Sequence, residues 1–394
     1  MIIQVGVAIL VLSAFAMFII DYGLLWVSRH QAQNSADAGA LAGATSLALD
    51  DFDNRTATGP AKLAARSFAI ANNVWDGAPD VQMAADVRFY PDAPAAFPAS
   101  CASDNCVRVD VHRTQARGNA LPMFLGFLVG LNNQGVRAMA IAQASAANAS
   151  NCMKPWAIAD KWEEHNPVVA PWDPTQTYDP TGATPDLYVP PSEDGKSTGT
   201  SFTIDADLGR KLLLKAGNPK DAINPGWFQA LDLPCASGNQ GADCYRENIS
   251  GCTTKVFSID QHFDVPKENG NMVGPTKQGV DDLIALDPLA TWNTKTNSVD
   301  GSCVDPKNYS CKTPGLTVSP RVVPVPIFDL DLYMKTGGPG KGTIHIVNIL
   351  GFFVDKMQGN DVLGYIAMKS DLLVSNGGSV SPSAAFLQAI RLVR

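Results

Sequence analysis

The sequence predicts an α+β protein: a long N-terminal membrane helix continues into a helix-on-sheet domain and is followed by a loop-rich, mostly β domain. Three observations support this fold class. An apolar segment opens the chain, an alanine-rich stretch without proline follows it, and the remainder alternates strand-like segments with stretches rich in proline and glycine. We expect a transmembrane helix over 1–27, a membrane-proximal α+β domain over 28–150 and a disulfide-braced β-rich domain over 151–394.

The first 27 residues form the membrane segment. Over residues 1–20 only Gln4 and Ser13 have polar side chains, and the apolar character resumes after Asp21. About 20 residues cross the hydrocarbon core of a bilayer, so residues 2–27 are long enough to span it with some tilt. A cleaved signal peptide is the alternative. The segment has no basic N-terminal region, however, and its helical pattern continues beyond it.

Asp21 is a carboxylate close to the end of this segment. A charged side chain in a membrane helix costs about 2.5 kcal/mol or more at the bilayer centre and less near an interface, so it usually has a partner or access to water. Two interpretations stay open. Asp21 lies at the headgroup level, with Tyr22 and Trp26 as interfacial aromatic residues, or it contacts another functional group. Both make it a polar site of the membrane helix.

Residues 28–50 contain no proline and are dominated by alanine, which predicts one unbroken helix from the membrane into the aqueous domain. Gly39 and Gly43 form a G-x-x-x-G pair that lets another backbone approach closely. Each interior glycine costs up to about 1 kcal/mol relative to alanine, so we expect close packing to offset it. The partner is either the chain's own domain or another protein. The residues of this helix-packing seam are Ala36, Gly39, Ala40, Gly43 and Ala44.

Several elements are predicted for the rest of the membrane-proximal domain. A second helix covers 60–73, with proline in its first turn, and alternating polarity predicts strands over 81–90, 107–112 and 136–146. The apolar segment 121–131 is too short to span a bilayer and is predicted as a helix that caps the sheet. The residues spaced along one face of the second helix are Leu63, Ser67, Phe68 and Ala71.

The outer domain is predicted to be mostly β. Residues 167–199 are dense in proline, aspartate, threonine and glycine and are predicted as loops, and one helix is predicted over 276–286. Proline within 322–326 removes backbone donors, which favours an edge strand. The strand candidates are 201–205, 210–215, 255–259, 322–330, 342–354 and 362–369.

The cysteines indicate an oxidising compartment. Their number is even and no C-x-x-C pair occurs, so zinc ribbons and thioredoxin-type sites lack their usual signature. Disulfides are the preferred interpretation, and reduced, buried thiols would apply only to a cytosolic chain. The candidates are Cys101, Cys106, Cys152, Cys235, Cys244, Cys252, Cys303 and Cys311.

Local spacing suggests how these cysteines pair. Cys101–Cys106 and Cys303–Cys311 would each close a short loop, worth roughly 2 to 3 kcal/mol in the chain-entropy model. Cys152 would then pair within the group formed by 235, 244 and 252, and the sequence does not choose among the three.

The sequence carries no recognisable catalytic or cofactor motif. Its net charge of −8 provides no basic field for a nucleic acid. The five histidines show neither H-x-x-x-H nor H-E-x-x-H spacing, and neither a G-x-S-x-G elbow nor a P-loop is present. We therefore expect no enzyme activity, no metal site, no cofactor and no nucleic-acid partner.

The residues around the end of the membrane segment resemble a known family. Asp21-Tyr22-Gly23, followed by QAQNSADAGALAGA over 31–44, resembles the N-terminal signature of TadE/TadG-like Flp (Tad) pilus-assembly proteins, in which a membrane helix ends in an Asp-x-Gly turn and a helix of the form Q-x-A-A-D-A-A-A-L-A-G-A follows. Later segments of TadG-like chains are similar to 107–111, 121–131 and 135–147. Weaker similarity lies at 152–156, 270–276 and 320–326.

This resemblance implies a membrane-anchored, extracytoplasmic, non-catalytic component of Flp/Tad pilus assembly or secretion. Its partners would be the lipid bilayer and other Tad/Flp proteins, contacted through the N-terminal helix. It would lie in the inner membrane as a single-pass protein, with most of the chain in the periplasm or extracellular space. The alternative is a secreted or surface-exposed, adhesin-like ligand-binding protein. Whether the chain enters the pilus, and whether its outer domain has a ligand, stay open.

The sequence departs from the family in two respects. Members commonly carry an Arg/Lys-rich stub before the membrane helix, whereas this chain opens at Met1 and Arg29 follows the helix, so charge alone does not fix the orientation or the true start codon. Larger relatives carry a von Willebrand A-like domain with a D-x-S-x-S metal motif. That motif is missing here, so metal-dependent adhesion is not implied.

Overall fold

The computed structural model describes residues 2–49, 59–101, 106–126, 130–147, 149–165, 172–173, 175–217, 222–259, 262–302, 319–336, 342–371 and 384–393. The chain forms two compact units. Unit 1 comprises Met1–Ala144 and Ile390–Arg394, and unit 2 comprises Ser145–Ala389. The predicted α+β class, with a long apolar N-terminal helix before a mostly β part, is confirmed. The domain limits at 27 and 150 stay predictions about independently folding parts.

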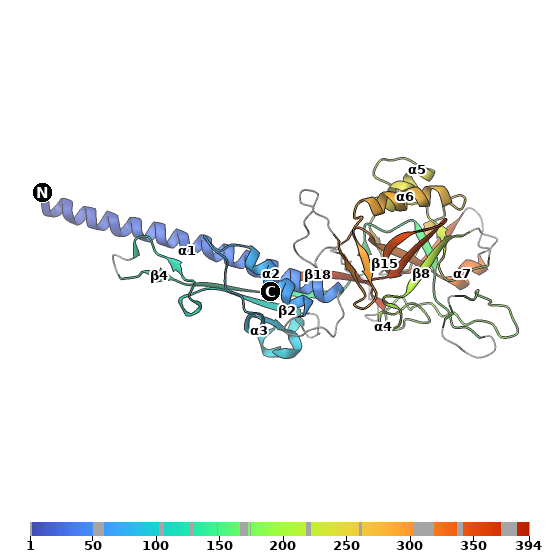
Figure 1. Cartoon of the computed structure of the whole chain (residues 1–394), viewed down its shortest axis with the longest axis horizontal. Coiled ribbons are helices and arrows are strands. Elements are labelled where there is room, and N and C mark those ends of the chain that lie inside the picture. The colour runs from blue at the N-terminus through green and yellow to red at the C-terminus, as the bar shows by residue number, and fades with distance from the viewer. Residues whose placement is uncertain are drawn as a thin grey trace. The chain divides into compact units, whose positions relative to one another are not determined.

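Helix α1 (Ile2–Leu49) runs unbroken through the apolar and the alanine-rich segments, as predicted (Figure 1). Its two halves differ in burial. The side chains over 2–16 are all exposed, whereas from Asp21 onward one side of the helix is buried. Within the described ranges, α1 is the one helix long and apolar enough to cross a membrane.

Helix α2 (Pro60–Ala71) lies beside the C-terminal half of α1 (Figure 1). A Cβ atom built on Gly39 would lie 2.8 Å from the backbone oxygen of Ala65 and 2.9 Å from the Cβ of Ala69. One built on Gly43 would lie 3.0 Å from the Cβ of Ala65 and 3.0 Å from Val107. The glycines therefore permit a backbone separation that no larger residue would allow.

The face of α2 that contacts α1 is its alanine face. The buried residues include Ala61, Ala65 and Ala69, spaced four apart, while Leu63 is 45% exposed and Phe68 is 36% exposed. The helix itself was predicted correctly. The close approach at the α1 glycines leaves room only for methyl groups, so the larger side chains of α2 point away from it.

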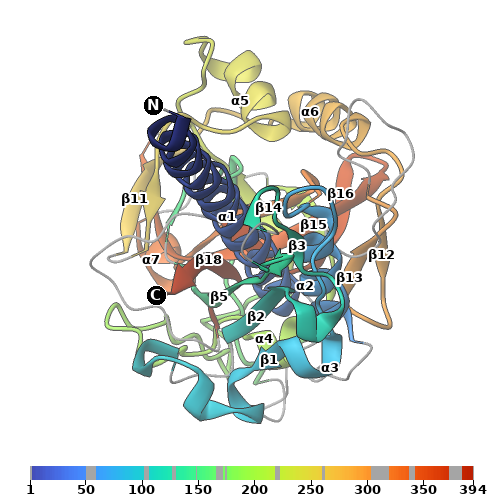
Figure 2. The same cartoon turned by 90° about the vertical axis from the view of Figure 1, so that its left-hand side faces the viewer.

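The sheet of unit 1 has the strand order β1 (Val87–Phe89), β2 (Cys106–Arg113), β5 (Val136–Ala146), β18 (Leu387–Val393), and β17 (Lys369–Asp371) of unit 2 adds a fifth strand beside β18. β2 pairs antiparallel with both β1 and β5, and Val109 faces Ala140 in the register. Figure 2 shows β2 and β5 side by side next to α1. Valines of β2 and small residues of α1 share one buried core.

Two predictions in unit 1 are wrong. Residues 83–86 form a helical turn, α3 (Met83–Asp86), rather than part of a long strand. The apolar segment 121–131 does not form a capping helix in its described residues, because β3 (Leu121–Pro122) pairs antiparallel with β4 (Asn133–Gln134) as a hairpin. Short 3-10 turns stand at Tyr90–Asp92, Pro94–Ala96, Ala99–Cys101 and Gln115–Arg117.

Unit 2 is built on a closed barrel of six strands. The strands follow one another around it in the order β15, β14, β7, β9, β8, β16, and β16 pairs again with β15. The long β15 makes this closure possible, since its first part pairs with β11 and its last part with β16. The bounds are β7 (Trp156–Ala159), β8 (Lys211–Ala216), β9 (Trp227–Ala230), β11 (Phe263–Pro266), β14 (Val322–Phe328), β15 (Thr343–Gln358) and β16 (Asp361–Ile366).

Strand β14 was predicted at an edge but lies between β15 and β7. All seven of its residues are buried. The backbone oxygen of Pro324 accepts from the N–H of Lys154, on the side away from β15. Because the nitrogen and oxygen of one strand residue point to the same side, the missing N–H of Pro324 also faces away from β15. The ladder to β15 therefore survives the prolines.

Helices and short strands surround the barrel. α6 was predicted, whereas α5 and α7 were not, and 201–205 forms a helical turn at its end instead of a strand. α5 and α6 lie side by side outside the barrel (Figure 1). The bounds are α4 (Ile204–Asp207), α5 (Gly241–Ser250), α6 (Val273–Ala285), α7 (Leu330–Lys335), β6 (Ala149–Ser150), β10 (Phe257–Ser258), β12 (Thr291–Asn293), β13 (Ser298–Asp300) and β17 (Lys369–Asp371).

The packing of α1 predicts opposite effects for one substitution at two of its glycines. Gly39→Ala should destabilise unit 1 by about 1–2 kcal/mol, because overpacking outweighs the gain in helix propensity. Gly23→Ala should stabilise it by up to about 1 kcal/mol, since among the described residues nothing beyond the adjoining helix backbone lies within 4 Å of the Gly23 Cβ position. Hydrogen exchange of the β2 amides in detergent-solubilised protein measures both effects. Equal stabilisation by the two substitutions would contradict this packing.

Candidate functional site

The candidate site lies around Asp21, where the exposed apolar half of α1 ends and the half-buried part begins. Asp21 is 3% exposed. Its Oδ1 accepts from the N–H of Phe124 at 2.8 Å, and its Oδ2 accepts from the N–H of Leu125 at 3.1 Å. The carboxylate thus holds the β3–β4 hairpin against the helix. Asp21 thus has a partner within the chain, and its position at the headgroup level stays a prediction.

The hairpin joined to Asp21 carries exposed apolar residues at its tip. Phe124 is 52% exposed and Leu131 is 50% exposed. Backbone bonds close the tip, from the N–H of Leu131 to Gly126 at 2.9 Å and from that of Met123 to Asn132 at 3.3 Å. The sequence contains a signal for this turn, since proline at 122 and glycine at 126 and 130 punctuate the apolar run.

Trp75 reinforces the contact from a second loop. It adopts a left-handed backbone conformation, φ 62°, in the tight turn between Val74 and Gly77. Its N–H donates to Oε1 of Gln31 on α1 at 2.6 Å, and its ring meets that of Phe124 edge-on with centroids 6.1 Å apart. A non-glycine residue with positive φ is strained. The strain coincides with a contact that joins both loops to α1.

The helix-packing seam is occupied within the chain. Ala36, Ala40 and Ala44 are fully buried, and the Cβ positions of Gly39 and Gly43 are blocked by α2 and β2. Within this chain the five residues join α1 to α2 and β2. A role of the seam in docking another protein stays a prediction.

Charged residues brace the segment that leads into the hairpin. Arg117 donates to Asp80 at 2.8 Å and to Asp86 at 2.8 Å, and Nε2 of His112 lies 3.3 Å from the same Asp86. Asp86 is 2% exposed. Arg117 lies four residues before the start of β3, so this cluster fixes the base of the hairpin while Asp21 fixes its tip.

Three pairs of cysteines lie at disulfide distance. Cys101–Cys106 closes the loop between β1 and β2, Cys152 pairs with Cys252 across 100 residues, and Cys235 pairs with Cys244. The structure thus selects one of the three partners left open for Cys152. Cys303 and Cys311 lie outside the described residues.

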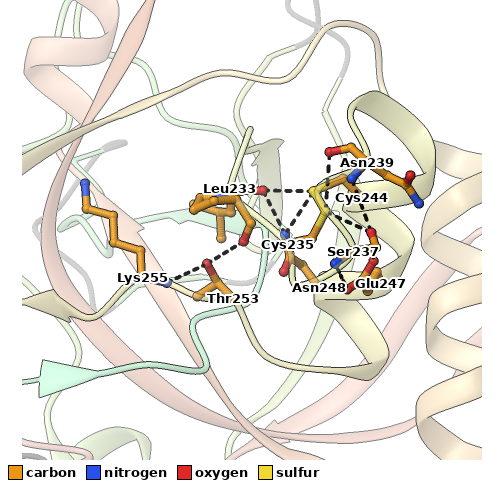
Figure 3. The surroundings of a disulfide bond; sticks show 10 residues. Leu233, Cys235, Ser237, Asn239, Cys244, Glu247, Asn248, Thr253 and Lys255 are labelled. Atoms are coloured by element: carbon orange, nitrogen blue, oxygen red, sulfur yellow. Dashed lines mark hydrogen bonds between the residues drawn. A yellow bond between two sulfur atoms is a disulfide. The ribbon is translucent and has the colours of Figure 1, made fainter.

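The Cys235–Cys244 bond ties a loop to α5, and hydrogen bonds support it on both sides (Figure 3). The N–H of Ser237 donates to Glu247 at 3.0 Å, and hydrogen bonds from Ser237 lower the pKa of that carboxyl. The amide of Asn248 donates to the backbone oxygen of Leu233 at 2.9 Å. These bonds and the disulfide hold the same two segments together.

Lys154 is buried at the C-terminal end of α5. Its Nζ donates to the backbone oxygens of Asn248, at 3.1 Å, and of Gly251. Burial, and secondly the charge of Lys369, lower the pKa of Lys154 to about 7. An amine at a helix C-terminus meets unpaired carbonyl groups and the negative end of the helix dipole. Lys154 therefore anchors the segment that carries Cys152.

Asp160 is fully buried at the end of β7. It accepts from Ser201 Oγ at 2.7 Å, from the N–H of Lys161 at 2.8 Å and from the hydroxyl of Tyr188 at 3.2 Å. Burial raises the pKa of Asp160 to about 7, although these hydrogen bonds favour the charged form. The cluster joins the barrel to the loops over 187–201.

No group of three or more histidine, cysteine, aspartate or glutamate side chains in the described ranges is arranged to hold a metal ion. The buried polar residues described above donate to or accept from neighbouring protein groups.

Comparison with protein families assigns the N-terminal part of the chain. Residues 5–46 match the model of Flp pilus-assembly TadE/G-like proteins, and residues 35–142 match that of Tad-like Flp pilus-assembly proteins. The resemblance found in the sequence is thus confirmed over α1 and most of unit 1. No curated protein and no solved structure matches the chain.

The Asp21 contact predicts a local effect on the hairpin. Asp21→Ala leaves two backbone N–H groups without their acceptor, which costs about 1–3 kcal/mol. Hydrogen exchange at the amides of residues 124 and 125 should accelerate roughly tenfold or more. Asp37→Ala is the matched control, because Asp37 lies on the same helix and accepts instead from Gln33. Unchanged exchange after Asp21→Ala would rule out the carboxylate as the acceptor.

The Asp160 cluster predicts how the stability of unit 2 depends on pH. The folded-state pKa of about 7 lies above the unfolded value, so the folded state binds more protons between about pH 4 and 7 and its stability falls as the pH rises through this window. Asp160→Asn should flatten this slope, measured by thermal unfolding through tryptophan fluorescence. The exposed Asp194→Asn should keep it, and a slope that persists in both variants would point to other groups.

Proposed function

We propose that this chain is a membrane-anchored, extracytoplasmic, non-catalytic component of Flp pilus assembly. The family matches support a role in this process and cover residues 5–142, nearly the whole first segment of unit 1. In this proposal the N-terminal half of α1 is a single-pass anchor in the inner membrane, and the rest of unit 1 and all of unit 2 lie in the periplasm or beyond it.

The observation that supports the anchoring proposal is the difference in burial between the two halves of α1. Its first half has exposed apolar side chains, whereas its second half is part of the core of unit 1. An exposed apolar helix in water is unfavourable, and about 20 residues suffice to cross the hydrocarbon core. Because the helix is continuous, unit 1 would be held directly at the membrane surface.

The cysteine pairs support an extracytoplasmic location for both units. One pair lies in unit 1 and two lie in unit 2. Disulfides persist in the periplasm and outside the cell, whereas the cytosol keeps thiols reduced. If the C-terminal end of α1 lies outside the cytoplasm, all three pairs lie in a compartment where disulfides persist.

A non-catalytic role agrees with the use of the buried polar groups. Arg321, for example, donates to backbone oxygens of Val354, Asp287 and Ala290, and so joins segments of unit 2. Lys154 and Asp160 are likewise bonded within the protein. We assign these groups to stabilising the unit.

A reporter fusion tests the topology. Alkaline phosphatase joined to the C-terminus should be active, because the enzyme requires its own disulfides and folds only outside the cytoplasm. The same fusion lacking residues 2–20 is the control and should be inactive. An inactive full-length fusion together with an active cytoplasmic reporter would contradict the orientation.

The role in pilus assembly is tested by complementation. Deletion of the gene should abolish Flp pili, and the complete chain should restore them. The chain lacking residues 2–20 should not restore them, because unit 1 would no longer be held at the membrane. Normal pili in the deletion strain would contradict the proposal.

A further inference from the structure

Exposed aromatic and aliphatic side chains of unit 1 gather around the point where Asp21 meets the hairpin. On α1, Tyr22 is 58% exposed and Trp26 is 60% exposed; on the hairpin, Phe124 and Leu131 are about half exposed. The hydrogen bonds from residues 124 and 125 to Asp21 set the hairpin tip at the level of these helix residues.

We propose that the tip of the β3–β4 hairpin inserts into the interfacial layer of the bilayer that α1 spans, as a second, monotopic membrane contact. This inference rests on the proposed anchoring by α1 and adds a lipid-binding element from a different part of the chain. The occupant of the apolar tip is thus the headgroup–acyl boundary, and the tip is not a docking site for a protein.

The length of the exposed part of α1 sets the depth of the tip. Residues 2–20 rise about 28 Å, close to the roughly 30 Å of a hydrocarbon core. Asp21 therefore falls at the boundary between hydrocarbon and headgroups. Since the tip is bonded to Asp21, Phe124 lies at the same boundary, where aromatic side chains are enriched.

Four backbone N–H groups in the described part of the tip have acceptors within the protein. Non-helical backbone is tolerated near hydrocarbon only when its polar groups are satisfied within the protein. The N–H groups of Phe124 and Leu125 donate to Asp21, those of Leu131 and Met123 to carbonyls across the tip. The same bonds give the Asp21 carboxylate donors at a depth where water is scarce.

Polar residues follow the tip in the sequence. Asn132, Asn133 and Gln134 are exposed, and so is Arg137 near the start of β5. An apolar tip followed by polar and basic residues matches the change in polarity from acyl chains to anionic headgroups. The segment was misread as a capping helix because its apolar residues serve the bilayer rather than a protein core.

Depth-dependent quenching in proteoliposomes tests the proposal with the full chain. An environment-sensitive fluorescent amino acid is placed singly at Leu10, Phe124 or Leu63, and the protein is reconstituted in phosphatidylcholine with phosphatidylglycerol. Leu63 is the matched control, because it is 45% exposed in the same unit but lies on α2, whose Ala61 and Ala65 meet Gly43, about 33 Å along α1 from Asp21. The quenchers are two lipids, one with a nitroxide near the headgroup and one with a nitroxide deep in the acyl chain, and aqueous iodide.

Phe124 should be quenched by the headgroup nitroxide and Leu10 by the acyl-chain nitroxide, and both should be protected several-fold from iodide relative to Leu63. If Leu10 is quenched by lipid but Phe124 is quenched by iodide, the insertion of the tip is overturned and the anchoring by α1 is not affected. Iodide quenching at both would instead overturn the anchoring itself. Phe124 exposed in vesicles but protected in the envelope of piliated cells would assign the tip to a protein and also overturn the proposal.

A second measurement uses the native chain, so it does not depend on a substitution at the tip. A carbene probe confined to the bilayer should label the tryptic peptide 118–137, which Arg117 and Arg137 delimit. Peptide 278–295 of unit 2 is the control, since it carries Leu286, 54% exposed, and Leu289, 61% exposed. Equal labelling of the two peptides would contradict the proposal. Asp21→Asn should lower labelling of 118–137 at least twofold and leave that of residues 1–29 unchanged.

Discussion

Unit 1 depends on the distance between the backbones of α1 and α2. With glycine at 39 and 43, the alanine face of α2 and the valines of β2 come into direct contact with α1, and the buried core of the unit forms around this line. A side chain of any size at those positions would separate the layers. The membrane-proximal sheet is consequently attached to the anchor helix along its C-terminal half and not through a linker.

Asp21 marks the point where the surroundings of α1 change. Toward the N-terminus the helix is exposed and apolar, and beyond Asp21 one side is covered by protein. The carboxylate accepts from two backbone N–H groups of the hairpin, and these supply the donors that a buried charge requires. Trp75, in a strained turn, contacts both the hairpin, through the ring of Phe124, and α1, through Gln31.

Local sequence patterns predicted the elements whose cause is local. The continuity of α1, the presence of α2 and the long strand β5 follow from composition and periodicity. The face of α2 was not predictable from its apolar residues, because the narrow gap at Gly39 selects alanine over Leu63 and Phe68. The hairpin at 121–131 was misread because an apolar run carries the same pattern whether it meets a core or, as proposed here, a bilayer.

Long-range pairings left no comparable trace in the sequence. The closure of the barrel by β15 and β16, and the choice of Cys252 as the partner of Cys152, depend on segments that meet only in the folded chain. The candidate site divides in the same way. Asp21 could be singled out because a charge near a membrane needs an explanation, whereas its partners at 124 and 125 could not.

The path of the chain between the units has a consequence for biosynthesis. The chain leaves unit 1 after Ala144 and returns at Ile390, so unit 2 is inserted between the third and fourth strands of the membrane-proximal sheet. A nascent chain that has not yet produced β18 presents β5 with an unpaired edge. A chain that ends before β18 would therefore leave this edge of β5 open even when every strand of the barrel has been synthesised.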